Sequence, residues 1–290
     1  MNDELLFRIP LGSWAQSFVS WLTSTLDGFF SFIGSLMEGL YDILGLVLGE
    51  PPFWIIALVL AAAAYVAKNW TLAVGSLIGF AFIYGVDQWD NAMASLALVV
   101  VASLIAVVVG VPLGIWAARN SKVSAGLRPV LDFLQTMPAF VYLIPAVVLF
   151  SLGVVPGVVA TILFAVAPGV RFTELGIRQV DAEVVEAGHA FGAKPGRILR
   201  QIQIPLAMPT IMGGINQVIM LSLSMVVIAG MVGAPGLGRP VVESLQRVDI
   251  GLGVEAGLSV VILAMYLDRV TAALGSRSKV SRAAKAKAAR

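Results

Sequence analysis

The chain is predicted to be an all-α integral membrane protein, and three features of its sequence lead to that fold class. Hydrophobic residues make up 59% and charged residues only 12% of the 290 residues, whereas an average soluble domain is about 25% charged. Charged residues are absent between Phe133 and Val170, and again between Leu206 and Gly238. Most of the basic residues gather in short segments between apolar stretches. These features favour helices that cross a bilayer, joined by charged loops.

Seven apolar stretches are candidates for transmembrane helices, which need about 20 apolar residues each. They cover residues 52–67, 70–86, 93–117, 130–151, 154–170, 207–232 and 252–273. Only Lys68-Asn69-Trp70 separates the first two, which predicts a tight helical hairpin. Prolines inside a span are tolerated where neighbouring helices or cavities satisfy the freed carbonyls, and this chain has Pro112, Pro138, Pro145 and Pro209.

Positive charge sets the expected orientation, because short cytoplasmic loops carry an excess of Lys and Arg. Most of the bases lie within residues 119–128, 171–200 and 277–290, and seven spans would place these three segments on one side. We therefore expect them, and the C-terminus, in the cytoplasm. The acidic loop 87–90, residues 234–250 and the N-terminus are expected outside.

Residues 13–49 are the ambiguous part of the chain. Large apolar residues recur there at helical spacing, but three acids interrupt the run, namely Asp27, Glu38 and Asp42. We favour an amphipathic helix that lies in the membrane interface. The alternative is an eighth span, which would place the N-terminus inside.

The expected organisation is one membrane domain with two flanking segments. Residues 1–52 form an amphipathic, interfacial segment, and residues 53–274 form the transmembrane domain. Residues 275–290 carry six bases and no acid, which suits a cytoplasmic chain end that is attracted to anionic lipid.

Several kinds of chemistry are excluded by what the chain lacks. It has no cysteine and a single histidine, His189, so it offers no thiolate nucleophile or Cys-based metal site, and no metal site is expected. No Gly-x-x-x-x-Gly-Lys-Ser/Thr sequence occurs, so the chain has no P-loop for ATP. We expect neither enzymatic activity nor a cofactor in this chain, nor a nucleic acid partner.

The expected cytoplasmic segment 171–205 is the most informative part of the chain. Its 35 residues far exceed the roughly 2–8 residues that usually connect neighbouring helices. Asp181 is expected to cap a helix from Ala182 to Phe191, and Gly192 is expected to end it.

A second short helix is expected after the turn Lys194-Pro195-Gly196. It would run to about Ile204, and Pro205 and Pro209 would end it. The segment therefore predicts a helix–turn–helix elbow at the membrane surface. One side of its first helix would be thin enough for a groove on a soluble partner, because small residues occur at Ala187, Gly188 and Ala190.

The spacing of residues in this segment resembles the "EAA" loop of permease subunits of ATP-driven importers. That loop reads Glu-Ala-Ala, three residues, Gly, nine residues and Ile-x-Leu-Pro, and the residues in register here are Glu186, Ala187, Gly192, Ile202 and Pro205. Gly188 and Ile204 depart from the pattern by small changes. Over residues 91–274 the chain resembles the permeases of binding-protein-dependent importers.

The resemblance implies a type I, methionine-importer-like permease fold in the cytoplasmic (inner) membrane of a bacterium. It also implies that the helix with Glu186 is a coupling helix, which docks in a cleft of a separate ATPase subunit that binds ATP and Mg. The expected coupling residues are Glu183, Glu186, Ala187, Gly188, Gly192, Ile202 and Pro205. Such ATPases close as pairs, so a second copy of the chain, or a sister permease, would supply the second docking helix. A solute-binding protein would deliver the solute from outside.

Two further runs, residues 134–145 and 221–238, resemble the permeases for glycine betaine, proline and choline. The implied solute is glycine betaine or a related osmoprotectant such as proline betaine, choline or carnitine. The alternatives are a permease of the same fold for an amino acid or a sulfonate, a secondary transporter and an osmotic channel. A secondary transporter predicts intramembrane carboxylates and inverted repeats, which the sequence does not show. A channel would not need the elbow.

The pore is expected between two permease copies, lined by the fourth and sixth spans, with the seventh as a further candidate. A zwitterionic or quaternary ammonium solute needs a passage with little fixed charge, and the charge-free runs fit that need. The candidates for lining are Gln135, Thr136, Phe140, Tyr142, Asn216, Gln217, Ser222, Ser224 and Met225. Packing or a hydrogen bond between helices is the alternative for each of them. Asp132 is expected to pair with Arg128, four residues earlier.

Overall fold

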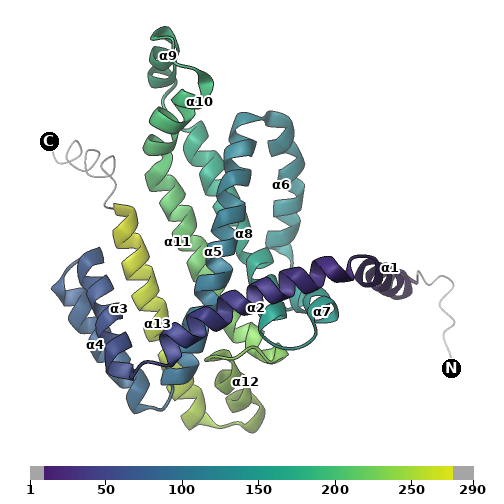
Figure 1. The fold of residues 1–290 in the computed structure, drawn as a ribbon, viewed down its shortest axis with the longest axis vertical. Coiled ribbons are helices and arrows are strands. Elements are labelled where there is room, and N and C mark those ends of the chain that lie inside the picture. The colour runs from purple at the N-terminus through teal and green to yellow at the C-terminus, as the bar shows by residue number, and fades with distance from the viewer. Residues whose placement is uncertain (1–9, 277–290) are drawn as a thin grey trace, which may run out of the picture.

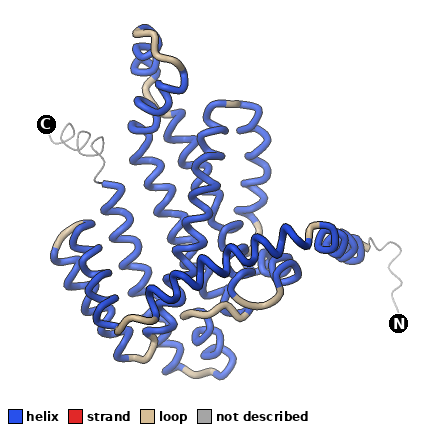
Figure 2. Tube along the Cα trace, viewed as in Figure 1, coloured by secondary structure: helices blue, strands red, loops and turns tan. Residues whose placement is uncertain are grey.

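The computed structural model describes residues 10–276, and every regular element in that range is a helix (Figure 1, Figure 2). In chain order the elements are α1 (Leu11–Thr25), α2 (Asp27–Gly49), α3 (Phe53–Ala67), α4 (Trp70–Gly85), α5 (Trp89–Arg119), α6 (Ser121–Thr136), α7 (Ala139–Phe150), α8 (Val154–Arg178), α9 (Ala182–Ala190), α10 (Pro195–Ile198), the π-helical turn η1 (Leu199–Gln203), α11 (Ile204–Ala229), the 3₁₀ turn η2 (Gly230–Val232), α12 (Gly238–Arg247) and α13 (Ile250–Ser276). The predicted all-α class is confirmed. The expectations for residues 1–9 and for the basic tail from residue 277 on lie outside the described residues.

Four of the seven predicted spans are long helices, namely α5, α8, α11 and α13. In the part of the chain that the structure describes, five stretches are long and apolar enough to cross a membrane: α2, α5, α8, the continuous helical run 195–232 that contains α11, and α13. The predicted hairpin is formed by α3 and α4, which have only 15 and 16 residues. The hairpin lies beside α13 (Figure 1).

The candidate span 130–151 is not one straight helix, and it stays a candidate for a broken span. The chain there forms α6 and α7, which are bent by 101° relative to each other. Met137 has an extended backbone with ψ of 135°, because the ring of Pro138 disfavours a helical conformation in the residue before it. The first of these helices also begins earlier than expected, since the Asn120 side chain caps it by accepting from the backbone N–H of Lys122 at 2.9 Å.

The helix α8 runs past the predicted span 154–170, so Arg171 lies in a helix and not in a loop. Its guanidinium pairs with the carboxylate of Asp132 on α6. The expected pair between Asp132 and Arg128 is therefore wrong. The reason is tertiary, because α6 packs alongside α8 and presents Asp132 to that neighbour.

The ambiguous stretch 13–49 forms α1 and α2. The 23 residues of α2 are long and apolar enough for a membrane span, yet α2 runs across the long axis of the bundle in Figure 1. It lies against α5, α7 and α8, and Met37 is its one buried residue. The expectation of an interfacial helix fits this transverse course and stays a prediction.

The centre of the bundle is α8, which packs closely against both α5 and α11. Glycines bring the backbones together. A Cβ on Gly114 of α5 would lie 2.5 Å from the carbonyl oxygen of Val170, and one on Gly214 of α11 would lie 2.5 Å from Phe172 Cβ. Lipid gives helices no hydrophobic reason to associate, so close van der Waals contact between small residues has to hold them together.

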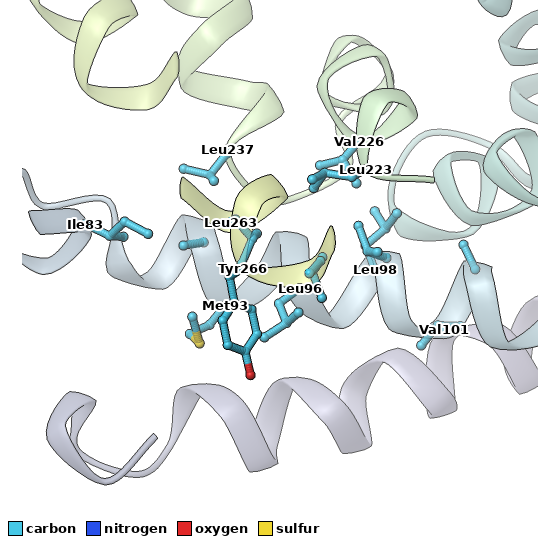
Figure 3. Packing of buried hydrophobic residues seen from close by; sticks show 14 of the residues in the cluster. Ile83, Met93, Leu96, Leu98, Val101, Leu223, Val226, Leu237, Leu263 and Tyr266 are labelled. Atoms are coloured by element: carbon cyan, nitrogen blue, oxygen red, sulfur yellow. The ribbon is translucent and has the colours of Figure 1, made fainter. Parts of the chain in front are cut away.

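A second packing region joins α13 to the hairpin and to α5. Tyr266 of α13 lies beside Met93 and Leu96 of α5 (Figure 3). Its hydroxyl donates to the carbonyl of Leu60 at 3.0 Å, and its ring meets Phe80 edge-on at 5.1 Å between centroids. Such an aromatic pair adds about 0.5–1.5 kcal/mol beyond the burial of its area. The short hairpin is therefore held by side chains from a long helix.

The loop after α11 folds back onto the bundle through its glycines. Gly236 has φ of +119°, and a Cβ there would lie 2.4 Å from Ser95 Oγ of α5. The same Ser95 hydroxyl accepts from the backbone N–H of Leu237 at 2.8 Å. A Cβ on Gly238 would lie 2.3 Å from a carbonyl oxygen of α11. The glycines in residues 221–238 therefore serve close backbone packing.

Candidate functional site

Residues 179–203, called the elbow from here on, form the farthest point of the molecule in Figure 1. There α9 and α10 extend past the ends of the bundle helices. At the opposite end lie α12 and the turn that precedes α5. The elbow, expected in the cytoplasm, therefore lies at the opposite end of the bundle from loop 87–90 and α12, which are expected outside.

The first limb of the elbow, α9, has two well-defined ends. The Asp181 carboxylate accepts from the backbone N–H of Glu183 at 2.9 Å, which is the N-cap that the sequence predicts. At the other end Gly192 has φ of +74°, a left-handed conformation that is inexpensive only for glycine. The backbone N–H of Ala193 then donates to the carbonyl of Gly188 at 3.1 Å and closes the turn.

The second limb is not a separate helix. The chain passes from α10 through η1 into α11, and the helical run is continuous over residues 195–232. The backbone N–H of Ile204 donates to the carbonyl of Leu199, five residues earlier, so the π turn rearranges the hydrogen bonds around Pro205, which has no N–H. The predicted stop at Pro205 and Pro209 is therefore wrong.

The two limbs meet at Gly188, which is buried. A Cβ on Gly188 would lie 2.9 Å from Ile202 Cδ1 and 3.4 Å from Ile198 Cγ1. The thin side of α9 at this residue is thus filled by isoleucines of the same chain, and it is not open to a partner as the sequence suggested. This contact also explains why glycine replaces the second alanine of the "EAA" pattern.

The other predicted coupling residues divide into an outer and an inner set. Glu183, Glu186 and Ala187 are exposed on α9. Ile202 and Pro205 are half-buried in the second limb. The exposed residues on α9 can contact a partner protein. The half-buried residues belong to the second limb, against which α9 packs.

Phe191 is a surface residue that the sequence prediction missed. Its side chain is 91% exposed, more than any other large hydrophobic residue in the described range. It follows the last residue of α9 and precedes Gly192. The available signal was a bulky aromatic residue directly before a glycine that ends a helix.

A polar clasp, defined here as Ser124, Glu174 and Arg178, ties the base of the elbow to the bundle. Ser124 donates to the Glu174 carboxylate at 2.7 Å, and Arg178 Nε lies 2.9 Å from the same oxygen. Arg178 also donates to the carbonyl of Ala117 at 3.0 Å. The Glu174 side chain is only 12% exposed, so loss of a partner would leave a poorly solvated charge. The clasp therefore fixes the end of α8 from which the elbow starts.

A cleft of about 500 Å³ opens between α6, α8 and α11. The side chains that line it are Gln135, Phe164, Pro168, Arg171, Phe172, Gln217 and Leu221. Two predicted lining residues, Gln135 and Gln217, both line this cleft although they are on different helices. Thr136, Phe140 and Ser224 are also exposed, but they do not line it.

The remaining pore candidates take part in packing. Ser222 is buried and donates to the carbonyl of Val218 at 2.8 Å, and Met225 is completely buried. Tyr142 is buried as well, and its hydroxyl donates to a carbonyl of α6. In this structure these three residues are packed inside the bundle, which was the alternative to a role in lining the pore.

Asn216 faces α13. Its side-chain amide donates to the Asp268 carboxylate at 3.1 Å, and its carbonyl accepts from the Thr271 hydroxyl. This is a hydrogen bond between helices, as the alternative for this residue supposed. Within residues 10–276, no three His, Asp or Glu side chains gather in a way that could hold a metal ion.

Residues 110–280 match the family described as "Binding-protein-dependent transport system inner membrane component". The chain belongs to this family. It is a multi-pass permease subunit of the inner membrane, and the ATPase that drives transport is a separate subunit. The match covers most of the core that the sequence predicted, residues 91–274.

Individual relatives cover the permease almost from end to end. It is 46% identical to the glycine betaine transport system permease protein OpuAB of Bacillus subtilis, over 92% of this chain and 95% of that protein. It is 47% identical to the glycine betaine/carnitine transport permease protein GbuB of Listeria monocytogenes, over 93% and 97%. Identity to the glycine betaine/proline betaine permease protein ProW of Escherichia coli is 44%, over 94% and 78%.

The permease also resembles a solved structure, the MetNI methionine ABC transporter in inward-facing conformations. One crystal form aligns with a TM-score of 0.57 at 22% identity, over 68% of this chain and 95% of that one. Another gives a TM-score of 0.56 at 20% identity. These likenesses confirm the predicted methionine-importer-like fold and concern the fold alone.

Replacing Gly188 with Val is expected to separate the two limbs of the elbow, because the new side chain would overlap Ile202. Overpacking of this kind costs about 1–3 kcal/mol, so we expect roughly tenfold faster amide hydrogen exchange in the elbow. Ala187→Val adds a β-branched side chain at the neighbouring exposed position and serves as the matched control. Equal exchange rates in the two variants would contradict the contact.

Proposed function

We propose that this permease works with an ATPase and an extracytoplasmic binding protein to import glycine betaine and related osmolytes. The three relatives named above support the solute, since they share 44%, 46% and 47% identity with this chain and all carry glycine betaine in their names. ATP and Mg would bind to the ATPase, with no cofactor in the permease itself. The likeness to the methionine transporter is in fold and does not favour methionine as the solute.

One observation carries the proposed coupling mechanism, namely the continuity of the elbow with α11. Ile198 and Ile202 hold α9, and both belong to the unbroken helical run 195–232. A helix transmits a displacement along its axis with little internal deformation. A movement of α9 would therefore move α11, which packs on α8.

The outer face of α9 has the properties of a docking surface. Glu183 and Glu186 supply charge, and Phe191 supplies a large exposed apolar side chain directly after α9. Exposed aromatic residues that enter a pocket on the partner contribute much of the energy in many interfaces. We infer that Phe191 anchors α9 in the ATPase, and that the acids set its orientation.

Transport then follows as a shift between two states of the same permease. Nucleotide-driven closure of the ATPases would pull α9 and favour one arrangement of α8 and α11, and release would favour the other. A partner shifts such an equilibrium only as far as its affinities for the two states differ. Because the polar clasp ties the base of the elbow to the bundle, a force on α9 would also act on α8 and α11.

Gly192→Val is expected to reduce ATP-dependent uptake of glycine betaine severely, because a left-handed conformation costs a non-glycine residue about 1–2 kcal/mol. Gly196→Val is the matched control. A Cβ added to either glycine would meet open space, but Gly196 lies in helical backbone. Uptake would be measured in proteoliposomes that contain the permease, its ATPase and its binding protein.

Two outcomes of that uptake experiment would count against the proposal. Full uptake by Gly192→Val would contradict the coupling role of the elbow. Import of methionine or a sulfonate, but no betaine, by vesicles with the wild-type permease would contradict the assignment of glycine betaine as the solute. In the same vesicles Phe191→Ala should lose uptake and Phe191→Leu should keep part of it, since the fold does not depend on a side chain that is 91% exposed.

We further infer that two copies of the permease form the pore. ATPases of this kind act as pairs, and each permease chain presents one elbow. Mass spectrometry of the purified complex under native conditions should show two copies of this chain with two ATPase subunits. A complex with a single copy and a different sister permease would contradict the homodimer.

The proposed orientation has the N-terminus outside and the C-terminus in the cytoplasm. The chain has no cysteine, so single-cysteine variants can be labelled without background. A membrane-impermeant maleimide on spheroplasts should react with Ser13→Cys in α1 and Leu245→Cys in α12, but not with His189→Cys in α9. Protection of Ser13→Cys with labelling of Leu245→Cys would show instead that the N-terminus is inside and that α2 crosses the membrane.

A further inference from the structure

The cleft between α6, α8 and α11 brings together three kinds of chemistry. Arg171 supplies a fixed positive charge, Phe164 and Phe172 supply aromatic rings, and Gln135 and Gln217 supply amides. Its volume of about 500 Å³ lies within the roughly 300–1,000 Å³ that is usual for small-molecule sites. The sequence predicted a passage with little fixed charge, yet this cleft holds a guanidinium, which is paired with the carboxylate of Asp132.

The guanidinium of Arg171 is held in place by one partner and still has N–H donors for a solute. It pairs with Asp132 through one of its terminal nitrogens, and a guanidinium carries five N–H donors. Its side chain is 42% exposed, so the remaining donors can meet a solute. Asp132 therefore acts as a positioning residue that keeps the positive charge at the wall of the cleft.

The two aromatic rings are also positioned by their neighbours. Phe172 lies directly over the backbone of Gly214 on α11, where a Cβ would come within 3.2 Å of its Cγ. Phe164 meets Tyr142 of α7 in a T-shaped pair with 6.0 Å between ring centroids. Rings that are fixed in this way lose little entropy when a ligand binds.

Pro168 removes one backbone donor from α8 at the same wall. It has no N–H, so the carbonyl of Phe164, one helical turn earlier, lacks the donor that an α-helix normally provides. Both residues line the cleft.

We propose that this cleft is a transient binding site for an ammonium carboxylate, a solute with a quaternary ammonium group at one end and a carboxylate at the other. Arg171 takes the carboxylate, because a guanidinium and a carboxylate form charge-assisted hydrogen bonds. Phe164 and Phe172 take the methylated ammonium group, which aromatic faces attract through their quadrupole. Gln135 and Gln217 orient the solute between these ends.

The site makes the permease itself selective among osmolytes. Choline has the quaternary ammonium group but no carboxylate, so it gains nothing from Arg171. Glycine betaine, proline betaine and carnitine have both groups. This inference rests on the proposed function, since it concerns how the importer treats that class of solute once the binding protein has released it.

Saturation-transfer NMR on the intact permease–ATPase complex in nanodiscs, without the binding protein, tests the site directly. The methyl protons of glycine betaine should receive saturation from the protein, and choline should bind about tenfold more weakly, which is the scale of a charge-assisted hydrogen bond. Arg171→Gln should bring betaine down to the level of choline. Phe172→Leu should weaken both solutes.

Two control variants separate the site from general damage. Arg247→Gln breaks an exposed pair with Glu243 on α12, and Phe133→Leu replaces a phenylalanine that is 62% exposed on α6 outside the cleft. Both should bind betaine like the wild type. Equal binding of choline and betaine by the wild type, or an unchanged preference in Arg171→Gln, would overturn the proposal.

The NMR and uptake experiments together distinguish failure of the proposed binding site from failure of the proposed import function. If vesicles with the binding protein take up betaine but the NMR experiment shows no betaine bound to the permease, only the cleft proposal fails. If the vesicles take up no betaine at all, the proposed function fails, whatever the cleft binds.

Discussion

The close contact of α8 with α5 and α11 is the constraint on which the rest of this structure depends. Gly114 and Gly214 allow it, because a Cβ at either position would collide with α8. In lipid there is no hydrophobic driving force to bring helices together, so the bundle relies on van der Waals contact at short range. Once α8 is placed between its neighbours, the starting point of the elbow and the walls of the cleft are placed as well.

Elbow and cleft are therefore parts of one mechanical unit. The elbow connects the end of α8, which Glu174 and Arg178 hold, to the helical run that becomes α11. The cleft lies along the same two helices, where Phe172 of α8 rests on Gly214 of α11. Packed helices of this kind switch between discrete arrangements rather than bending continuously. A small movement of α9 can thus change the shape of the cleft without any change in the elbow itself.

The two runs that resemble the osmolyte permeases turn out to be dominated by backbone geometry. Pro138 breaks the run 134–145 into α6 and α7, and the glycines near Ser95 let the run 221–238 fold back onto α5. Hydropathy alone could not reveal these features, since a charge-free stretch scores the same whether it is straight or bent. The elbow shows the same limit, because Pro205 reads as a helix stop but is absorbed by the π turn at residues 199–203.

Local sequence determined the membrane class, the long helices, the cap at Asp181 and the glycine stop at Gly192, because hydrophobic length, side-chain capping and positive φ act within a few residues. The spaced motif in the elbow also pointed to the permease family. Only the tertiary structure decided which side of each helix meets another. It turned Gly188 inward onto Ile202, paired Asp132 with Arg171 and buried Tyr142 and Met225. Those outcomes depend on the rotation of each helix relative to the helix it packs against, which no local pattern encodes.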